Sequence, residues 1–245
     1  MKVKNIKSFI DFYSSMGISL KIGKVERKKL SSLNTLSEFD AKKTKINSTL
    51  HSKNDLKVIL DKILNLDCNL KDIATNVVLS DGNFDSEIMF IGEAPGAEED
   101  KLGKPFVGQA GKLLDNMLNF IGLNRKTNFY ITNIVFWRPP GNRTPTKSEI
   151  NTCLPITKSH IKIFKPKLLI FLGNVATKSL LKTEEGISKL RGKKLTYIDE
   201  EHKLKIPARA FFHPAYLLRN PIDKKKVWSD LIELHNYLKE KKIRF

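Results

Sequence analysis

The stretch EIMFIG at residues 87–92 is a short apolar run that ends at a glycine, a pattern typical of a buried strand. Similar runs predict three further strands, FYITNIVF (129–136), KLLIFL (167–172) and PARAFF (207–212). Apolar residues at helical spacing lie between or after these runs, over 111–121, 147–164, 174–181 and 224–241. This alternation predicts an α/β fold with parallel strands, in which ligands gather where the strands end.

The first part of the chain has a different character. Apolar residues recur at helical spacing over 5–17, which predicts a short amphipathic helix. Residues 21–53 are rich in Lys, Ser, Thr and Asn without a sustained period, as in a flexible basic linker. Another amphipathic helix is predicted over 54–66. We therefore divide the chain into an N-terminal helix with a basic linker (1–53) and a globular domain (54–245).

Composition narrows the class of partner. A net charge of +18 over 245 residues favours a polyanion. An acidic centre, 61–120, lies between basic flanks, which suggests carboxylates held for chemistry inside a basic frame. The longest strongly apolar stretch, 168–172, is far short of the roughly 20 residues that span a bilayer, so no membrane partner is expected. The N-terminus does not resemble a secretory signal, and two cysteines form no disulfide framework, so we expect a soluble, cytoplasmic protein.

Two motifs follow the first predicted strand. GEAPGAEED (92–100) combines glycines, which let a ligand approach the backbone, with carboxylates. An acidic surface loop would show the same composition. KPFVGQAG (104–111) holds Phe106 between Pro and Gly ahead of a helix start, where the ring could stack on a base and backbone N–H groups could bind a phosphate. A core phenylalanine followed by a helix cap is the alternative.

Two more motifs follow later strands. In TNIVFWRPPGNR (132–143), the amide of Asn133 can both accept from and donate to one edge of a pyrimidine. In HPAYLLR (213–219), His213 can donate to a carbonyl oxygen, and the apolar tip with its arginine can enter a duplex. A single histidine at a strand end is more often a structural hydrogen bonder. Four such motifs at four loops of one sheet favour a functional site.

The motifs GEAPGAEED, GKPFVGQAGKLLD, ITNIVFWRPPGNRTP and HPAYLLRNP, in this order, resemble the family-4 uracil-DNA glycosylases of bacteria and archaea. The resemblance runs from about Cys68 to Tyr237. It implies a three-layer α/β/α fold around a mostly parallel four-stranded sheet, with an N-terminal helical extension. It also implies a monomeric enzyme of base excision repair that flips uracil out of DNA and hydrolyses its N-glycosidic bond, leaving an abasic site. No lysine occupies a position typical of a Schiff-base nucleophile, so we expect no lyase activity.

The resemblance also assigns roles to single residues. Phe106 stacks on the uracil, Asn133 reads its N3/O4 edge, and His213 donates toward O2. Glu93 positions or activates the water, with Glu99 as a supporting candidate. The uracil pocket is completed by Gly92, Ala94 and Gly96. Leu217 is the expected wedge that fills the vacated stack. The full set expected to contact DNA is Gly108, Gln109, Arg138, Arg143, Tyr216, Leu217 and Arg219.

Members of this family usually carry a 4Fe-4S cluster on four cysteines. The corresponding positions here are Asn65, Cys68, Trp137 and Cys153. Because Asn and Trp do not replace thiolates on iron, we expect no cluster, no metal and no other cofactor. The Trp137 ring and apolar neighbours should fill the space, with the two cysteines close together as buried thiols.

Three other interpretations remain open. A protein of the same fold could bind uracil or damaged DNA without activity, although Phe106, Asn133 and His213 are all present. A nucleotide-binding enzyme would use the strand–loop–helix units for phosphate, but no G-x-x-x-x-G-K-[ST] or G-x-G-x-x-G motif occurs at a strand end. A basic nucleic-acid scaffold would explain the charge and leave the strand-end residues unexplained.

Overall fold

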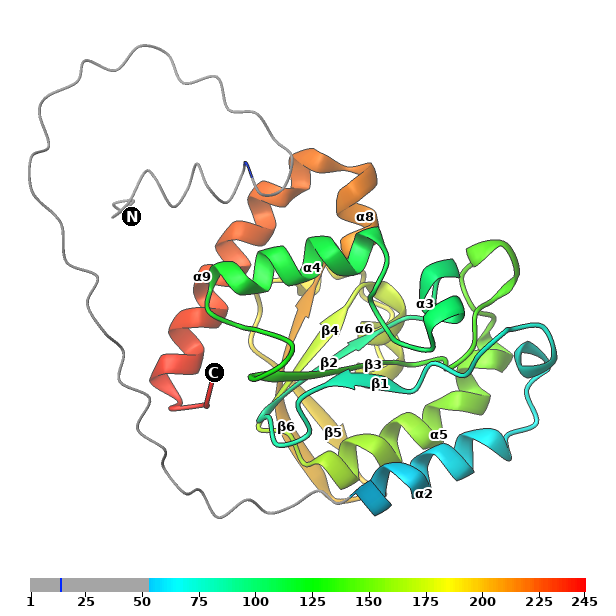
Figure 1. Ribbon diagram of the computed structural model, residues 1–245. Coiled ribbons are helices and arrows are strands. Elements are labelled where there is room, and N and C mark those ends of the chain that lie inside the picture. The colour runs from blue at the N-terminus through cyan, green and yellow to red at the C-terminus, as the bar shows by residue number, and fades with distance from the viewer. Residues whose placement is uncertain (1–13, 15–52) are drawn as a thin grey trace, which may run out of the picture. The chain divides into compact units, whose positions relative to one another are not determined.

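The computed structural model describes Ser14 and residues 53–245 (Figure 1). The helix predicted over 5–17 and the linker predicted over 21–53 lie outside the described residues, apart from Ser14 and Lys53. The boundary proposed between residues 53 and 54 therefore stays a prediction.

The described part of the chain is built around one six-stranded sheet, with strand order β1-β3-β2-β4-β6-β5. The four central strands β3, β2, β4 and β6 are parallel, and β1 and β5 pair antiparallel at the two edges. The predicted parallel centre is confirmed, but the predicted count of four strands is corrected to six. The strands are β1 Ser80–Gly82, β2 Ile88–Gly92, β3 Phe129–Asn133, β4 Leu168–Leu172, β5 Leu195–Asp199 and β6 Leu204–Phe211.

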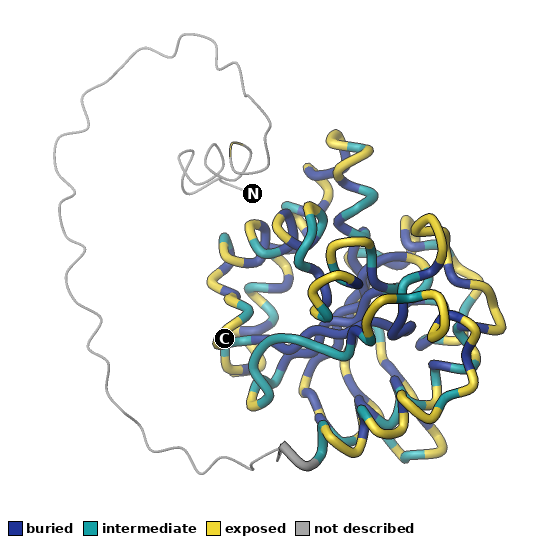
Figure 2. The backbone as a smooth tube through the Cα atoms, turned by 45° about the vertical axis from the view of Figure 1, so that its right-hand side comes forward, coloured by how far each residue is buried: buried dark blue, intermediate teal, exposed yellow. Residues whose placement is uncertain are grey.

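Neither edge strand has the run of apolar, β-branched and aromatic residues that predicted the central strands. The sequence of β1 is only SDG, and none of its three residues is buried. In β5, LTYID, exposed and buried positions alternate because one face is open to solvent. Strands β2, β3 and β4 are instead buried at every position, since helices cover both faces of the sheet. Figure 2 shows this contrast between the buried strands and the exposed outer surfaces of the helices.

Helices form the two outer layers of the predicted α/β/α arrangement. Helices α2 (Lys53–Leu64) and α5 (Lys147–Phe164) pack together on one face of the sheet, while α4 (Gln109–Phe120) and α9 (Lys224–Glu240) lie on the other (Figure 1). Helix α5 has the predicted bounds, and a capping box between Thr146 and Glu149 fixes its start. The remaining helices are α3 Ala97–Leu102, α6 Asn174–Leu181, α7 Ile187–Leu190 and α8 Pro214–Arg219, with short 3-10 turns at η1 Asn69–Asp72, η2 Pro140–Asn142 and η3 Pro221–Asp223.

The register brings the carboxyl ends of the central strands to one edge. Gly92 at the end of β2 pairs with Asn133 at the end of β3, and Leu172 of β4 pairs with Phe211 of β6. The polar motifs that follow these strands are therefore neighbours in space. Among residues 53–245, no helix is long and apolar enough to cross a membrane.

Candidate active site

The loops after the central strands surround one pocket of about 640 Å³. Most of the predicted site residues line it, namely Glu93, Ala94, Gly96, Phe106, Asn133, Arg143, His213, Tyr216 and Arg219. Gly92 lies against two of these side chains, whereas Gly108, Gln109, Arg138 and Leu217 are not part of the lining. The structure thus gathers four sequence motifs in one place, and the roles assigned to their residues stay predictions.

Gly92 allows the Asn133 amide and the Phe106 ring to approach each other. A Cβ atom on Gly92 would lie 2.4 Å from both Asn133 Oδ1 and Phe106 Cζ, so no larger residue fits there without displacement. Asn133 is 1% exposed, and its Oδ1 has no hydrogen-bond partner among the described residues. Leaving a buried acceptor unpaired costs about 1–3 kcal/mol. This amide is therefore suited to an incoming donor such as the N3–H of uracil.

Phe106 is held in an unusual backbone conformation beside this amide. Its φ of 54° lies in the left-handed region, which non-glycine residues rarely adopt. The next two N–H groups, of Val107 and Gly108, both donate to Glu99 Oε1 at 2.8 Å. The structure thus gives Glu99 a part in holding the loop. The Gly108 N–H is already engaged by Glu99, and the DNA contact predicted at Gly108 stays a prediction.

His213 follows β6 and caps helix α8. Its Nδ1 accepts a hydrogen bond from the backbone N–H of Ala215 at 3.2 Å, so in the neutral ring the proton is on Nε2. Burial and, to a smaller extent, the charge of Arg219 lower the pKa of His213 to about 4, while Glu99 opposes the shift. At neutral pH the side chain is therefore an uncharged donor. Its ring lies 5.7 Å from the Phe106 ring, centroid to centroid.

Glu93 follows β2 and is half-buried at the pocket wall. Loss of solvent raises the pKa of this carboxyl, while a hydrogen bond with Thr144 and the charge of Arg219 oppose the rise. Thr144 also lines the pocket and was missed by the sequence analysis. Thr144 directly follows Arg143, a predicted DNA contact, in the motif GNRTP, and this position could have marked it as a site residue. Nothing in the sequence showed that Thr144 reaches Glu93.

The loop that carries Thr144 is fixed from the side of α5. Both terminal nitrogens of Arg143 donate to the carboxylate of Glu149, at 2.7 and 2.9 Å. The same carboxylate accepts from the backbone N–H of Thr146, and these contacts lower the pKa of Glu149 to about 2. Arg143, predicted to contact DNA, is thus engaged in a bidentate ion pair. Arg138 donates to Asn142 Oδ1 at 2.7 Å, and its DNA contact stays a prediction.

Helix α8 corrects the predicted wedge. Leu217 is 0% exposed, so its side chain is part of the core and cannot enter a duplex as placed. The next residue, Leu218, is 44% exposed and precedes the exposed Arg219 at the pocket rim. Because successive residues of a helix point about 100° apart, only one of two adjacent leucines faces solvent, and the sequence alone does not say which.

The residues at the four positions where related enzymes carry cluster cysteines do not form a site for an iron–sulfur cluster. Cys68, Trp137 and Cys153 are all buried in the same apolar core cluster, whereas Asn65 is exposed. Burial raises the pKa of the Cys153 thiol to about 12, and the nearby Cys68 raises it as well. Two cysteines and an indole cannot supply the four thiolates that such a cluster requires. The donor set therefore does not fit a 4Fe-4S cluster.

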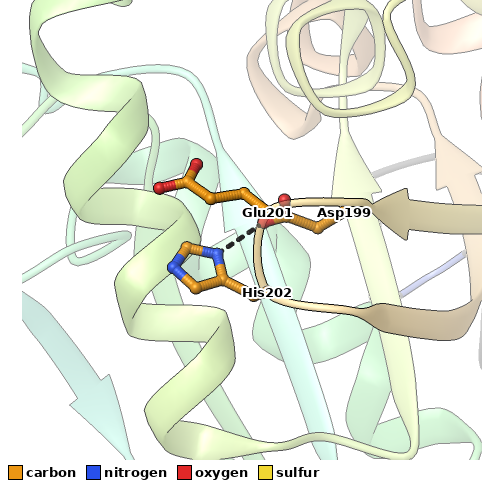
Figure 3. A group of neighbouring side chains, drawn as sticks. All are labelled: Asp199, Glu201 and His202. Carbon is orange, nitrogen blue, oxygen red and sulfur yellow. Dashed lines mark hydrogen bonds and ion pairs between the residues drawn. The ribbon is translucent and has the colours of Figure 1, made fainter.

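One other polar cluster lies away from the pocket, at the turn between β5 and β6. Asp199 Oδ2 accepts from the Tyr197 hydroxyl at 3.0 Å and pairs with His202 Nδ1 at 2.9 Å, with Glu201 beside them (Figure 3). The turn precedes β6, while the pocket lies after this strand. These contacts hold a hairpin in place at the opposite end of β6.

Comparison with known proteins agrees with this fold and pocket. A family model described as "Uracil DNA glycosylase superfamily" matches residues 79–232. A type-4 uracil-DNA glycosylase of Saccharolobus solfataricus is 40% identical over 195 residues, covering 77% of this chain and 89% of the relative. A type-4 enzyme of Thermotoga maritima is 43% identical over 154 residues, covering 62% and 77%. The chain therefore belongs to the uracil-DNA glycosylase superfamily and, within it, to the type-4 family.

The state of His213 predicts the pH dependence of excision. Because its pKa is lowered to about 4, the ring stays neutral at every pH above that value. The excision rate plotted against pH should therefore show no inflection near 6.5, the ordinary pKa of histidine. The acid limb should instead lie above the ordinary carboxyl value of 4.5, because the pKa of Glu93 is raised and its expected role with the water requires the ionised carboxylate. Single-turnover rates between pH 4 and 8 test this expectation. An inflection near 6.5 that His213→Ala abolishes would contradict it.

Proposed function

We infer that this uracil-DNA glycosylase, an enzyme of DNA repair, hydrolyses the N-glycosidic bond of a flipped deoxyuridine and leaves the strand intact. The observation that carries this proposal is the unpaired, buried Asn133 amide oxygen in a pocket that also holds the Phe106 ring and His213. Uracil inside a duplex is inaccessible, so the base must leave the stack to reach such a pocket.

Recognition follows from the chemistry of the pocket walls. Asn133 Oδ1 accepts the N3–H of uracil, and the amide nitrogen donates to O4. The Phe106 ring stacks on the base, which is worth about 1–3 kcal/mol per base. Backbone around Ala94 and Gly96 completes the wall of the pocket.

The chemical step uses two groups on opposite sides of the bond. When the bond between N1 and C1′ breaks, its electron pair goes to the uracil, and negative charge develops at O2. Nε2–H of His213 donates to this oxygen through a hydrogen bond that strengthens as the charge grows. The Glu93 carboxylate, steadied by Thr144, orients the water that adds to C1′ and accepts its proton. The leaving uracil anion then takes up a proton.

DNA lies across the pocket mouth in this proposal. Leu218 replaces Leu217 as the apolar wedge, because it is exposed beside Arg219. Arg138, Tyr216, Arg219 and the exposed Gln109 at the start of α4 contact the backbone. The net charge of +18 supports phosphate binding, so affinity should fall steeply with salt. We also propose that the protein acts as a monomer in the cytoplasm.

Product analysis tests the reaction class. Among the described residues that line the pocket there is no lysine, so we expect hydrolysis without a covalent imine. A single-uracil oligonucleotide should yield free uracil and an alkali-labile abasic site, with equal rates in EDTA. Asn133→Ala, purified identically, should lose most of the activity and so excludes a contaminating enzyme. A borohydride-trapped protein–DNA adduct or inhibition by EDTA would contradict the proposal.

The two adjacent leucines provide a matched test of the wedge. Leu218→Ala should change the free energy of unfolding by less than about 0.5 kcal/mol, as for other surface substitutions. It should slow excision from double-stranded DNA on the order of tenfold and spare single-stranded DNA, since only a duplex needs its stack filled. Leu217→Ala should lower the free energy of unfolding by about 2–5 kcal/mol. Equal excision rates for wild type and Leu218→Ala on duplex DNA would refute the assignment.

We also propose that the enzyme works without an iron–sulfur cluster, since the donor set contains only Cys68 and Cys153. Protein prepared anaerobically should be colourless and iron-free by elemental analysis, yet excise uracil. Near-stoichiometric iron with a broad band around 400 nm, the usual region of iron–sulfur charge transfer, would show that other ligands complete a site.

A further inference from the structure

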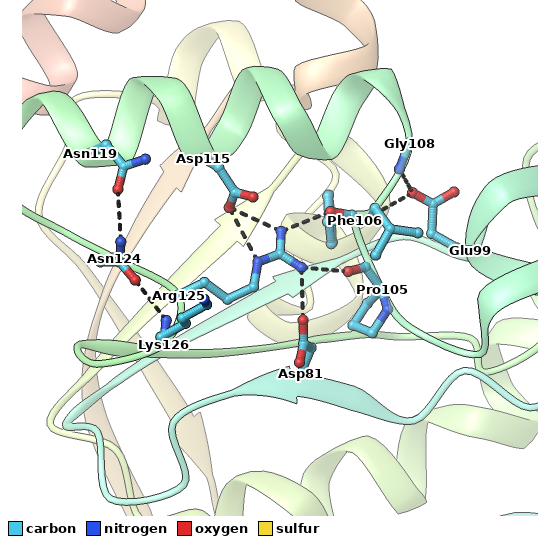
Figure 4. Close-up of polar contacts among 11 residues, drawn as sticks. Asp81, Glu99, Pro105, Phe106, Gly108, Asp115, Asn119, Asn124, Arg125 and Lys126 are labelled. Atoms are coloured by element: carbon cyan, nitrogen blue, oxygen red, sulfur yellow. Dashed lines mark hydrogen bonds and ion pairs between the residues drawn. The ribbon is translucent and has the colours of Figure 1, made fainter.

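Arg125 does not line the pocket but contacts the turn that carries Phe106, and all three nitrogens of its guanidinium donate hydrogen bonds. The side chain is 14% exposed and lies in the segment between α4 and β3. Its nitrogens make five hydrogen bonds, which reach two carboxylates and two backbone carbonyls (Figure 4). The acceptors are Asp115 Oδ1 at 3.0 and 3.2 Å, Asp81 Oδ2 at 3.2 Å, Pro105 O at 2.8 Å and Phe106 O at 2.7 Å.

The two carbonyls belong to the strained turn that carries the stacking ring. Phe106 has a φ of 54°, a conformation that costs of order 1–3 kcal/mol and persists only where its surroundings impose it. Arg125 fixes the carbonyls of Pro105 and Phe106, while Glu99 fixes the following two N–H groups. Gly111 packs against the same peptide, since a Cβ there would lie 1.8 Å from Phe106 O. A cation and an anion therefore clamp the turn from two sides.

The two aspartates orient the cation toward this turn. Asp81 comes from edge strand β1, and Asp115 comes from α4. Burial raises the pKa of Asp115, and the charge of Arg125 opposes this rise. Only a planar fork reaches two neighbouring carbonyls and two carboxylates at once, because a lysine ammonium has three donors on one atom. The arrangement thus uses the geometry of arginine as well as its charge.

We propose that Arg125 is a positioning residue of the uracil pocket, which holds the Phe106 backbone in its left-handed conformation so that the ring is preorganised to stack on the flipped base. This inference rests on the proposed excision of uracil. Arg125 touches neither base nor sugar and acts only through Phe106. Its loss lets the turn relax and moves the ring out of place, while the His213 donor is unaffected. The defect therefore falls on capture of the base, not on bond cleavage.

A double-mutant cycle on excision tests this role. We compare wild type, Arg125→Met, Phe106→Ala and the double variant by kcat/KM on single-stranded DNA with one uracil. Phe106→Ala should lower kcat/KM by about five- to 150-fold, the equivalent of one lost stack. Arg125→Met should lower it by about five- to 50-fold, mainly through KM, as a partial loss of the same stack. In the Phe106→Ala background it should cost less than about twofold, because no ring remains to position.

Two further variants keep the test decisive. Arg125→Lys retains a cation between the aspartates and so protects folding, and it should show the same dependence on Phe106 with a smaller loss. Arg244→Met removes an arginine that is 54% exposed and pairs with Glu87. It should leave kcat/KM unchanged in both backgrounds.

The outcomes separate this inference from the function on which it rests. Equal losses from the Arg125 substitutions with and without the Phe106 ring would show a merely structural role and overturn the proposal. No loss from either substitution would overturn it as well. If wild type itself released no uracil, the proposed function would fail; an additive cycle in an active enzyme refutes only the role of Arg125.

Discussion

The pocket depends on the missing side chain at Gly92. Strand β2 ends at this residue in register with Asn133 of β3, so backbone pairing alone brings the amide to the pocket wall. The Phe106 ring then approaches from another loop to within 2.4 Å of the point where a Cβ would stand. Backbone hydrogen bonds of the sheet thus set the position of the amide, and the glycine admits the ring. Any side chain at this strand end would push the Asn133 amide and the Phe106 ring apart.

Most of the charged side chains described around the pocket hold the backbone of its loops in place. Arg125, Glu99 and the Arg143–Glu149 pair each bind peptide groups or the loops that carry pocket residues. Two titratable side chains that line the pocket itself lie in a different environment. His213 is kept neutral by burial, and Glu93 is partly desolvated. A low-dielectric pocket strengthens the hydrogen bonds it offers to developing charge, and the surrounding ion pairs keep its walls rigid.

The sequence predicted those features that local pattern encodes. Runs rich in apolar, β-branched and aromatic residues predicted the four central strands, and helical spacing placed α5 at its observed bounds. Edge strand β1 was not predicted because SDG contains no large apolar residue. Strand β5 was not predicted because only one of its faces is buried. The positions of Phe106, Asn133 and His213 were predictable from strand ends and resemblance. The left-handed turn at Phe106 and the partners of Arg125 were not, because they join residues from β1, α4 and two loops.

The neighbouring leucines show a finer limit of the same kind. Leu217 and Leu218 are identical in chemistry, and only the rotation of α8 on the core decides which is buried. Arg143 was similarly ambiguous, since an arginine in a basic segment suits phosphate as well as a carboxylate. Glu149 resolves that choice only once the capping box has brought its carboxylate under the loop. Tertiary packing therefore selects among roles that residue type leaves open.

The buried cluster of Cys68, Trp137 and Cys153 joins the segment before η1 to helix α5 by packing. In a cluster-bearing protein, coordination bonds would tie the same segments together. Here the buried side chains hold these segments together by apolar contact. The free energy of this packing varies with temperature as hydrophobic burial does, and it weakens on cooling.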